Sequence, residues 1–349
     1  MKCRGRRPWR LVKEITKNRR KKMKNICIIG SGSWGTALAT HLAKLGHNVK
    51  VWSYSQEESD LINKEKKCKF LPTITLPENI YCTTDFKEAI DGTEMILIVT
   101  PSKFVRDTIK KFKKFVTNQP IIICSKGFEA GTLYSLNEVV EEELPNCKVA
   151  GLAGPSHAEE VSVGIPTALV ASSKDDNLLE EISQTFMSKN LRVYKSYDIK
   201  GAELGGSLKN IIAFCSGVAT GLNLGDNTSA ALVTRGLSEM AKLVVKMGGD
   251  ANTVYGLTGL GDLTVTCLSK HSRNRRAGIL IGQGKTIEEA KKEIGMVIES
   301  IDNIQIAYEL SKKYNVEMPI VNAVHNVVFG ELKPQEAVVK LMTRGSKFE

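Results

Sequence analysis

Residues 26–35 read Ile-Cys-Ile-Ile-Gly-Ser-Gly-Ser-Trp-Gly, a short apolar run that ends in a glycine-rich turn. The apolar run predicts a buried parallel strand, and residues 34–45 after it have the periodicity of a helix. The turn fits the pattern G-x-G-x-x-G, which in this setting is typical of a dinucleotide-binding fold. Gly30 would allow the tight turn, Gly32 would let the backbone approach a pyrophosphate, and Gly35 would let the helix pack on the strand.

The alternation of strands and helices continues to about residue 196. Further buried strands are predicted at 48–52, 95–100, 121–124, 148–152 and 168–171. This alternation predicts an α/β fold with a doubly wound, Rossmann-type parallel sheet over residues 23–196. Residues 197–345 contain no convincing strand and predict an all-α domain, with helices at 200–222, 228–247, 286–294, 300–314, 319–329 and 334–342. We expect ligands at the carboxyl ends of the strands, in a cleft that the helical domain closes.

The net charge of +11 is unevenly distributed along the 349 residues. Residues 1–22 hold eleven lysines and arginines and one acid, so this leader carries +10 and the rest of the chain is nearly neutral. We interpret residues 1–22 as a disordered extension before a domain that starts at Met23. A targeting segment, or an arm for nucleic acid or lipid, is the alternative. The near-neutral body argues against a nucleic-acid partner.

The eight cysteines include no C-x-x-C pair, and several lie inside apolar runs. That pattern indicates buried reduced thiols and neither a metal site nor a disulfide framework. No apolar run reaches the roughly 18 residues of a membrane helix. We therefore expect a soluble, cytoplasmic protein without integral membrane association, and a homodimer is compatible with the sequence.

Two turns that follow predicted strands carry candidate ligand-binding residues. Lys126, in Ser-Lys-Gly, could meet an anion or a carbonyl, although a solvated loop lysine is the alternative. The turn Gly154-Pro155-Ser156-His157-Ala158 has small residues that let a ligand approach the backbone. His157 is interpreted as an ordinary surface or structural histidine, because nothing nearby in the sequence orients it.

The predicted helical domain opens with a second lysine, Lys209, which Asn210 follows on a glycine-containing helix. A lysine that is partly desolvated there would have a lowered pKa and could transfer protons near neutrality, whereas an exposed lysine is the alternative. Asp262 follows a Gly-Leu-Gly turn and could hold a neighbouring lysine or a substrate hydroxyl.

Residues 272–276, Ser-Arg-Asn-Arg-Arg, open another predicted helix. A helix N-terminus with Arg, Ser and Asn donors is suited to a phosphate, and a nucleic-acid or targeting patch is the alternative. Together these features fit hydride transfer between a nicotinamide and a small phosphorylated ketone or alcohol.

At the predicted end of the second strand, Trp52-Ser53-Tyr54-Ser55 offers neither an acid for NAD nor an arginine for NADP, so dual use with a slight preference for NADPH is expected.

Six motifs in this order resemble the bacterial NAD(P)-dependent glycerol-3-phosphate dehydrogenase family over residues 23–345. They are Gly-Ser-Gly-Ser-Trp-Gly-Thr-Ala-Leu-Ala, Ser-Lys-Gly-Phe-Glu, Gly-Pro-Ser-His-Ala, Gly-Gly-Ser-Leu-Lys-Asn, Gly-Leu-Gly-Asp-Leu and Ser-Arg-Asn-Arg-Arg. The resemblance implies reduction of dihydroxyacetone phosphate to sn-glycerol 3-phosphate, which supplies phospholipid synthesis. Residues 1–22 lie outside it.

The resemblance also implies roles for individual residues. Lys209 would be the proton donor or acceptor, Lys126 a second lysine that contacts substrate and cofactor, and Asp262 the aspartate of the catalytic group. The candidate substrate site comprises Lys126, Gly154, Ser156, Lys209, Asn210, Asp262, Ser272, Arg273 and Asn274. The candidate cofactor site comprises Gly30, Gly32, Ser33, Trp34, Gly35, Tyr54, Lys126, Ala158, Arg273, Val297 and Glu299. Tyr54 stands where the family usually has His or Arg, so the chain departs from the family pattern at that contact.

Two other functions are compatible with parts of the sequence. A β-hydroxyacid or phosphogluconate dehydrogenase also uses a helix lysine with an asparagine after it, but at a wider spacing than Lys209 and Asn210. A nucleic-acid-binding protein would use the leader and residues 273–276. Deletion of residues 1–22 separates the enzyme from the nucleic-acid binder, because only the enzyme is expected to keep its activity.

Overall fold

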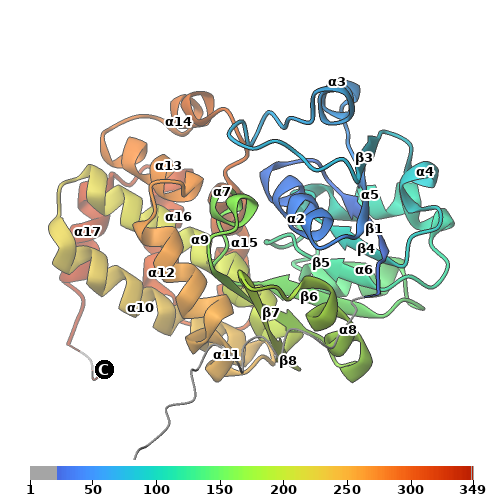
Figure 1. The fold of residues 1–349 in the computed structure, drawn as a ribbon. Coiled ribbons are helices and arrows are strands. Elements are labelled where there is room, and N and C mark those ends of the chain that lie inside the picture. The colour runs from blue at the N-terminus through green and yellow to red at the C-terminus, as the bar shows by residue number, and fades with distance from the viewer. Residues whose placement is uncertain (1–21, 347, 349) are drawn as a thin grey trace, which may run out of the picture.

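The computed structural model describes residues 22–346 and 348 of the chain, so the predicted leader 1–22 lies, apart from Lys22, outside the described residues. The first half builds one sheet with helices on both faces (Figure 1). Its strands are β1 Asn25–Ile29, β2 Asn48–Trp52, β3 Ile80–Thr83, β4 Met95–Ile98, β5 Ile121–Ile123, β6 Val149–Ala153, β7 Thr167–Ser172 and β8 Leu191–Ser196. Its helices are α2 Ser33–Lys44, α3 Gln56–Asp60, α4 Phe86–Ile90, α5 Val105–Phe112, α6 Leu136–Glu143, α7 Ala158–Val163 and α8 Asp176–Phe186.

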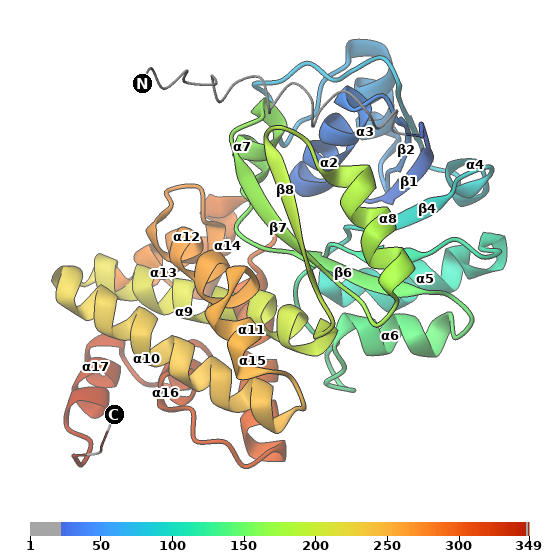
Figure 2. The same ribbon diagram turned by 60° about the horizontal axis from the view of Figure 1, so that its bottom comes forward.

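The strand order is β3-β2-β1-β4-β5-β6-β7-β8, and the chain reverses direction across the sheet after β3. This is the doubly wound, Rossmann-type arrangement that the sequence predicts. One pair departs from a fully parallel sheet, because β6 and β7 run antiparallel. The connecting helix α7 packs against α2 and does not run back along the sheet, so β7 starts at the end where β6 stops (Figure 2).

Helices cover both faces of the sheet and enclose two apolar cores. Helices α2, α7 and α8 pack on one face, and α4, α5 and α6 pack on the other. Strand β4 (Met-Ile-Leu-Ile) is fully buried between them, as expected for a central parallel strand. The layers hold β1, β4 and β5 in place, so their carboxyl ends form a fixed edge.

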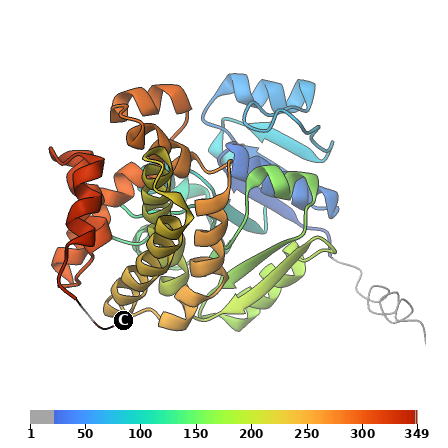
Figure 3. The ribbon, with the colours of Figure 1, turned by 90° about the vertical axis from the view of Figure 1, so that its left-hand side faces the viewer.

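The second half of the described chain is helical, and Figure 3 shows its helices gathered beside the sheet. They are α9 Ile199–Gly221, α10 Gly225–Lys246, α11 Ala251–Tyr255, α12 Asp262–Leu268, α13 Arg273–Gly282, α14 Ile287–Ile294, α15 Glu299–Lys313, α16 Pro319–Phe329 and α17 Pro334–Met342. The six helices predicted from periodicity are present, and so is the helix predicted to open at residues 272–276, which is α13. Helices α11 and α12 were not predicted, because they have five and seven residues and so show little periodicity.

Helix α9 is the centre of the helical half and is buried along most of its length. It meets α13 backbone to backbone: a Cβ at Gly217 would lie 2.1 Å from the Arg275 carbonyl oxygen, and one at Gly278 would lie 2.0 Å from that of Phe214. Such spacing is open only to glycine, so the two helices are held at one short separation. No helix in residues 22–346 is both long and apolar enough to cross a membrane.

Candidate active site

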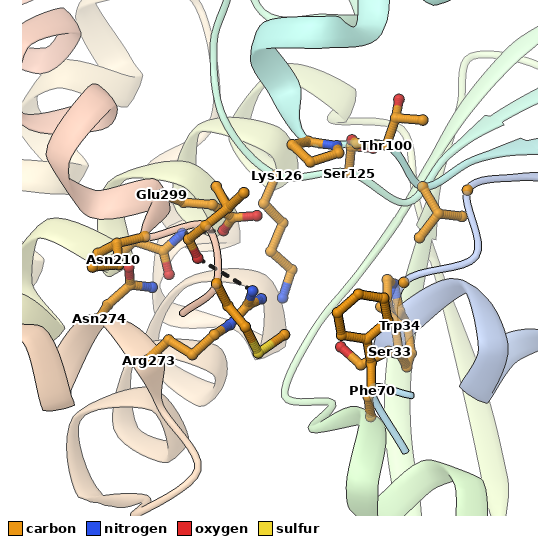
Figure 4. A pocket seen from close by; sticks show the side chains of 18 of the residues that line it. Ser33, Trp34, Phe70, Thr100, Ser125, Lys126, Asn210, Arg273, Asn274 and Glu299 are labelled. Carbon is orange, nitrogen blue, oxygen red and sulfur yellow. Dashed lines mark hydrogen bonds between the residues drawn. The ribbon is translucent and has the colours of Figure 1, made fainter. Parts of the chain in front are cut away.

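A cleft of about 860 Å³ lies between the carboxyl edge of the sheet and the helical half. One wall is formed by the glycine turn after β1 and by residues at the ends of β2, β4 and β5. The other wall is formed by α9, the start of α13 and the segment 295–299. Figure 4 shows Lys126 reaching between these walls, with Ser33 and Trp34 on one side and Arg273 and Asn274 on the other.

The glycine turn presents bare backbone to this cleft. Gly30 has a φ of +125°, which favours glycine, and a Cβ at Gly35 would lie 2.0 Å from the Gly30 carbonyl oxygen. Gly32 precedes α2 without a side-chain cap, and no heavy atom lies within 4 Å of where its Cβ would be. The first N–H groups of α2 therefore remain available to an anion in the cleft.

Opposite the turn, one carboxylate holds two lysines. Lys126 follows β5, and its Nζ donates to Asp262 Oδ2 at 2.5 Å. Lys209 lies on α9, and its Nζ donates to Asp262 Oδ1 and to Thr266 Oγ1, the latter at 2.7 Å. Asp262, the first residue of α12, is 1% exposed, and Lys209 is 5% exposed. The cluster thus places one surplus positive charge at a buried position beside the cleft.

Burial and mutual attraction set the protonation of these groups. Burial lowers the pKa of Lys209 to about 8, and the nearby Lys126 lowers it too, while Asp262 opposes both. Burial also disfavours the charge on Lys126, but Asp262 raises the pKa of that lysine overall. The pKa of Asp262 is lowered despite its burial, because the two ammonium groups stabilise the carboxylate. Lys209 is therefore the member of the cluster that can exchange a proton near neutral pH.

The start of α13 forms the far end of the cleft. The Ser272 side chain caps the helix by accepting the N–H of Arg275 at 3.2 Å. The Arg273 guanidinium lies in the cleft and donates to the Val297 carbonyl oxygen at 3.2 Å (Figure 4). Asn274 Oδ1 accepts the N–H of Ser300 at 3.0 Å. These contacts fix the direction of the helix start and leave its guanidinium at the cleft surface.

Two further residues of the helical half join the site through a single hydrogen bond. Asn210, the neighbour of Lys209, donates from Nδ2 to Glu299 Oε2 at 2.9 Å. Glu299 is the first residue of α15 and follows the segment 295–298 that borders the cleft. The bond therefore ties that segment to the helix that carries Lys209.

The turn between β6 and α7 supports Lys126 and contributes to the wall. The Gly154 carbonyl oxygen accepts Lys126 Nζ at 3.5 Å and the Ser156 hydroxyl at 3.0 Å. His157 also lines the cleft, and its Nε2 is buried with no partner in the described chain. The interpretation of His157 as an ordinary surface or structural residue is therefore corrected to a cleft residue. Its position in the sequence between Ser156 and Ala158, which the family resemblance places in the site, was the signal that could have indicated this.

The cleft brings most of the sequence-predicted residues together. Those that line it are Gly30, Gly32, Ser33, Trp34, Tyr54, Lys126, Ser156, Ala158, Lys209, Asn210, Ser272, Arg273, Asn274, Val297 and Glu299. Gly35, Gly154 and Asp262 lie behind this lining and act through their neighbours. The Thr266 hydroxyl accepts a hydrogen bond from Lys209 Nζ. The sequence did not indicate a role for Thr266, because only the packing of α12 on α9 brings the two residues together.

The lining fits a dinucleotide better than a metal ion. The uncapped start of α2 and the open space at Gly32 form a cradle for a pyrophosphate, which a side chain at Gly32 would fill. In residues 22–346 and 348, no three His, Cys, Asp or Glu side chains are grouped as metal ligands would be.

Comparison with known families agrees with this geometry. The family models for the N-terminus and the C-terminus of NAD-dependent glycerol-3-phosphate dehydrogenase match residues 25–179 and 198–339. The chain belongs to the NAD-dependent glycerol-3-phosphate dehydrogenase family. The family resemblance seen in the six sequence motifs is thereby confirmed.

Individual members of the glycerol-3-phosphate dehydrogenase family match almost the whole chain. The glycerol-3-phosphate dehydrogenase [NAD(P)+] of Fusobacterium nucleatum is 50% identical over 332 residues, which cover 94% of this chain and 99% of that protein. The Bacillus subtilis enzyme of the same name is 45% identical, with 94% and 96% covered. The crystal structure of glycerol-3-phosphate dehydrogenase from Coxiella burnetii superposes with a TM-score of 0.90 at 40% identity and covers 92% and 99% of the two chains.

Proposed function

We propose that this chain reduces dihydroxyacetone phosphate to sn-glycerol 3-phosphate, with NADH or NADPH as the reductant. The observation that carries the proposal is the Lys126–Asp262–Lys209 cluster, which shares one cleft with a glycine turn and with the start of α13. A reduced nicotinamide, when bound, supplies the two electrons and the hydrogen that the ketone carbon gains.

Lys209 is the proton donor in this proposal. Reduction of a ketone leaves negative charge on its oxygen, and an ammonium group that loses its proton near pH 8 can neutralise that oxygen. Lys126 has a raised pKa, so it keeps its charge and adds a positive field. Asp262 holds both ammonium groups in place and is the positioning residue of the cluster.

The start of α13 binds the phosphate in this proposal. The guanidinium of Arg273 is a planar donor that suits a phosphate, and the helix N-terminus adds backbone dipoles. To reach the phosphate, Arg273 would exchange its bond to the Val297 carbonyl for bonds to the ligand. Binding energy from the phosphate would then orient the reacting carbonyl toward Lys209.

The test is the oxidation of NADH and of NADPH by the purified full chain with dihydroxyacetone phosphate. Unphosphorylated dihydroxyacetone and a set of 2-ketoacids serve as controls. Turnover that requires the phosphate ester supports the proposal, and faster turnover of a ketoacid would overturn it in favour of a hydroxyacid dehydrogenase.

A cytoplasmic location stays a prediction from the sequence. A homodimer is also a prediction, and size-exclusion chromatography would decide between a monomer and a homodimer.

A further inference from the structure

The carboxylate of Glu58 lies at the carboxyl end of β2, although residues 52–55 at the strand end contain no acid and the next acids in the sequence begin at Glu57. Ser31 Oγ donates to Glu58 Oε2 at 2.6 Å, and Ser53 Oγ lies 3.2 Å from the same oxygen. The two hydroxyl oxygens lie 2.8 Å apart, and Ser53 also accepts the N–H of Ser55 at 3.1 Å. Glu58 belongs to the short helix α3, which turns the side chain back toward the strand end. The two serines thus hold one carboxylate oxygen in place.

This carboxylate adjoins the cleft. Ser31 is the second residue of the glycine turn and lines the cleft, so Glu58 lies one hydrogen bond behind the wall. In Rossmann-type folds the adenosine ribose of a dinucleotide lies beside the end of the second strand, and the group at that position distinguishes a ribose hydroxyl from a 2′-phosphate.

The cations that line the cleft come from parts of the described chain other than the end of β2. The cleft cations are Lys103, Lys126, Lys209, Arg273 and Lys291, and none of them belongs to β2 or α3. Tyr54, the residue after Ser53, is 90% exposed and uncharged. Of the lysines that follow α3, Lys64, Lys66 and Lys67 pair with Asp60, Glu78 and Glu65. Lys69, beside the cleft residue Phe70, is exposed.

We propose that Glu58, which Ser31 and Ser53 hold at the end of β2, makes this site prefer NADH to NADPH. The inference rests on the proposed function, because it needs a dinucleotide in the cleft. A 2′-phosphate brings nearly two negative charges, and a partly buried carboxylate repels them with little screening. The unphosphorylated ribose of NADH meets no such repulsion. The slight preference for NADPH that the sequence suggested rested on Ser53 to Ser55 alone and did not include Glu58.

The experiment measures the dissociation constants of NADH and NADPH for the full chain, by fluorescence titration without substrate. We expect NADH to bind at least about 10-fold more tightly, since juxtaposed like charges cost several kcal/mol. Glu58→Gln keeps the size and the hydrogen-bonding oxygen but removes the charge. It should tighten NADPH binding about 10-fold and change NADH binding less than about 3-fold. Thermal melting of each variant checks the fold.

Glu57→Gln is the matched control, because it removes the same charge from an exposed neighbour in the same helix. It should leave the NADH-to-NADPH ratio unchanged. Calorimetry with adenosine 2′,5′-bisphosphate and 5′-AMP measures binding without a nicotinamide. Glu58→Gln should tighten the binding of the bisphosphate and leave the binding of 5′-AMP unchanged.

Three results would overturn the inference. Equal or tighter binding of NADPH by the unmodified chain contradicts it directly. An effect of Glu58→Gln no larger than that of Glu57→Gln removes Glu58 from the role. If neither dinucleotide binds, the proposed function fails as well, whereas binding without preference refutes this inference alone.

Discussion

Lys209 and Asp262 lie 53 residues apart in the sequence and form an ion pair that is almost wholly buried. A buried pair with one charge of each sign would be neutral, but Lys126 binds the second oxygen of the same carboxylate. Two ammonium groups thus bind one carboxylate directly, while Glu299 attracts both of them from further away. The surplus charge is costly in the resting protein and is suited to a substrate oxygen that becomes negative during the reaction.

Replacement of the buried lysine tests its role as proton donor. Lys209→Met should lower kcat by about 10²- to 10⁴-fold, the usual contribution of a general acid, and leave the binding of NADH unchanged. Lys246→Met, at an exposed position of α10, is the control and should keep full activity. Steady-state kinetics with dihydroxyacetone phosphate measure both. Near-normal turnover of Lys209→Met, with the fold intact, would refute the assignment.

The pH dependence of the two reaction directions should be opposite. Ketone reduction needs protonated Lys209, so its kcat/KM should fall as the pH rises through about 8. Oxidation of glycerol 3-phosphate needs the neutral amine and should rise over the same interval. Asp262→Asn removes the anion that supports protonation, so both midpoints should move to lower pH. Flat profiles between about pH 7 and 10 would contradict this.

The guanidinium at the start of α13 should act on the phosphate and not on the ketone. Arg273→Lys loses the planar pair of donors, so KM for dihydroxyacetone phosphate should rise about 10-fold or more. The slow reaction of unphosphorylated dihydroxyacetone should be unaffected. Arg276→Lys, on the exposed side of the same helix, is the control. Equal losses with both substrates would show that Arg273 does not bind the phosphate.

Close packing of α9 on α13 should make one glycine indispensable. A Cβ at Gly278 would lie 2.0 Å from the Phe214 carbonyl oxygen. The position of a Cβ is fixed by its backbone and the oxygen is itself a backbone atom, so neither can turn aside. Gly278→Ala should therefore lower the free energy of unfolding by about 3 kcal/mol or more. Gly345→Ala, where the added atom meets nothing within 4 Å, should change it little. Urea denaturation measures both, and similar midpoints would contradict the packing argument.

Glu239 should make stability depend on pH. Burial raises the pKa of Glu239 to about 7, although its oxygens accept the N–H groups of Ile320 and Val321. Since the folded state binds this proton more tightly than the unfolded state, the contribution of Glu239 to stability is greatest below about pH 4.5 and is lost as the pH rises to about 7. The loss should be on the order of 1–3 kcal/mol. Glu239→Gln should flatten that slope in urea titrations, and an unchanged slope would contradict the prediction.

The local sequence predicted those strands and helices whose pattern of buried and exposed residues is regular. The strand at Met95–Ile98 is apolar throughout, so its burial could be recognised directly. Strands β3 and β8 were missed because exposed residues such as Tyr81 and Tyr194 interrupt their apolar pattern at the sheet edges.

In the site, likewise, residues within one motif could be predicted, but their hydrogen-bond partners from distant segments could not. Motifs predicted which residues lie near the cleft, since each motif is one turn or one helix start. Their partners could not be predicted in this way: Thr266 reaches Lys209 only because α12 packs on α9, and Ser31 meets Glu58 only because α3 folds back on β2. Hydrogen bonds between distant residues follow from packing, which periodicity does not record.

The glycine contacts between α9 and α13 have a consequence for which substrates can react. Lys209 is fixed to one helix and Arg273 to the other, and the backbones touch at Gly217 and Gly278. The distance between the helix positions of the proposed proton donor and the proposed phosphate-binding residue is therefore set within the helical half. If the proposed roles hold, a phosphate ester one carbon longer should still bind by its phosphate but react slowly, because its carbonyl would no longer lie at Lys209.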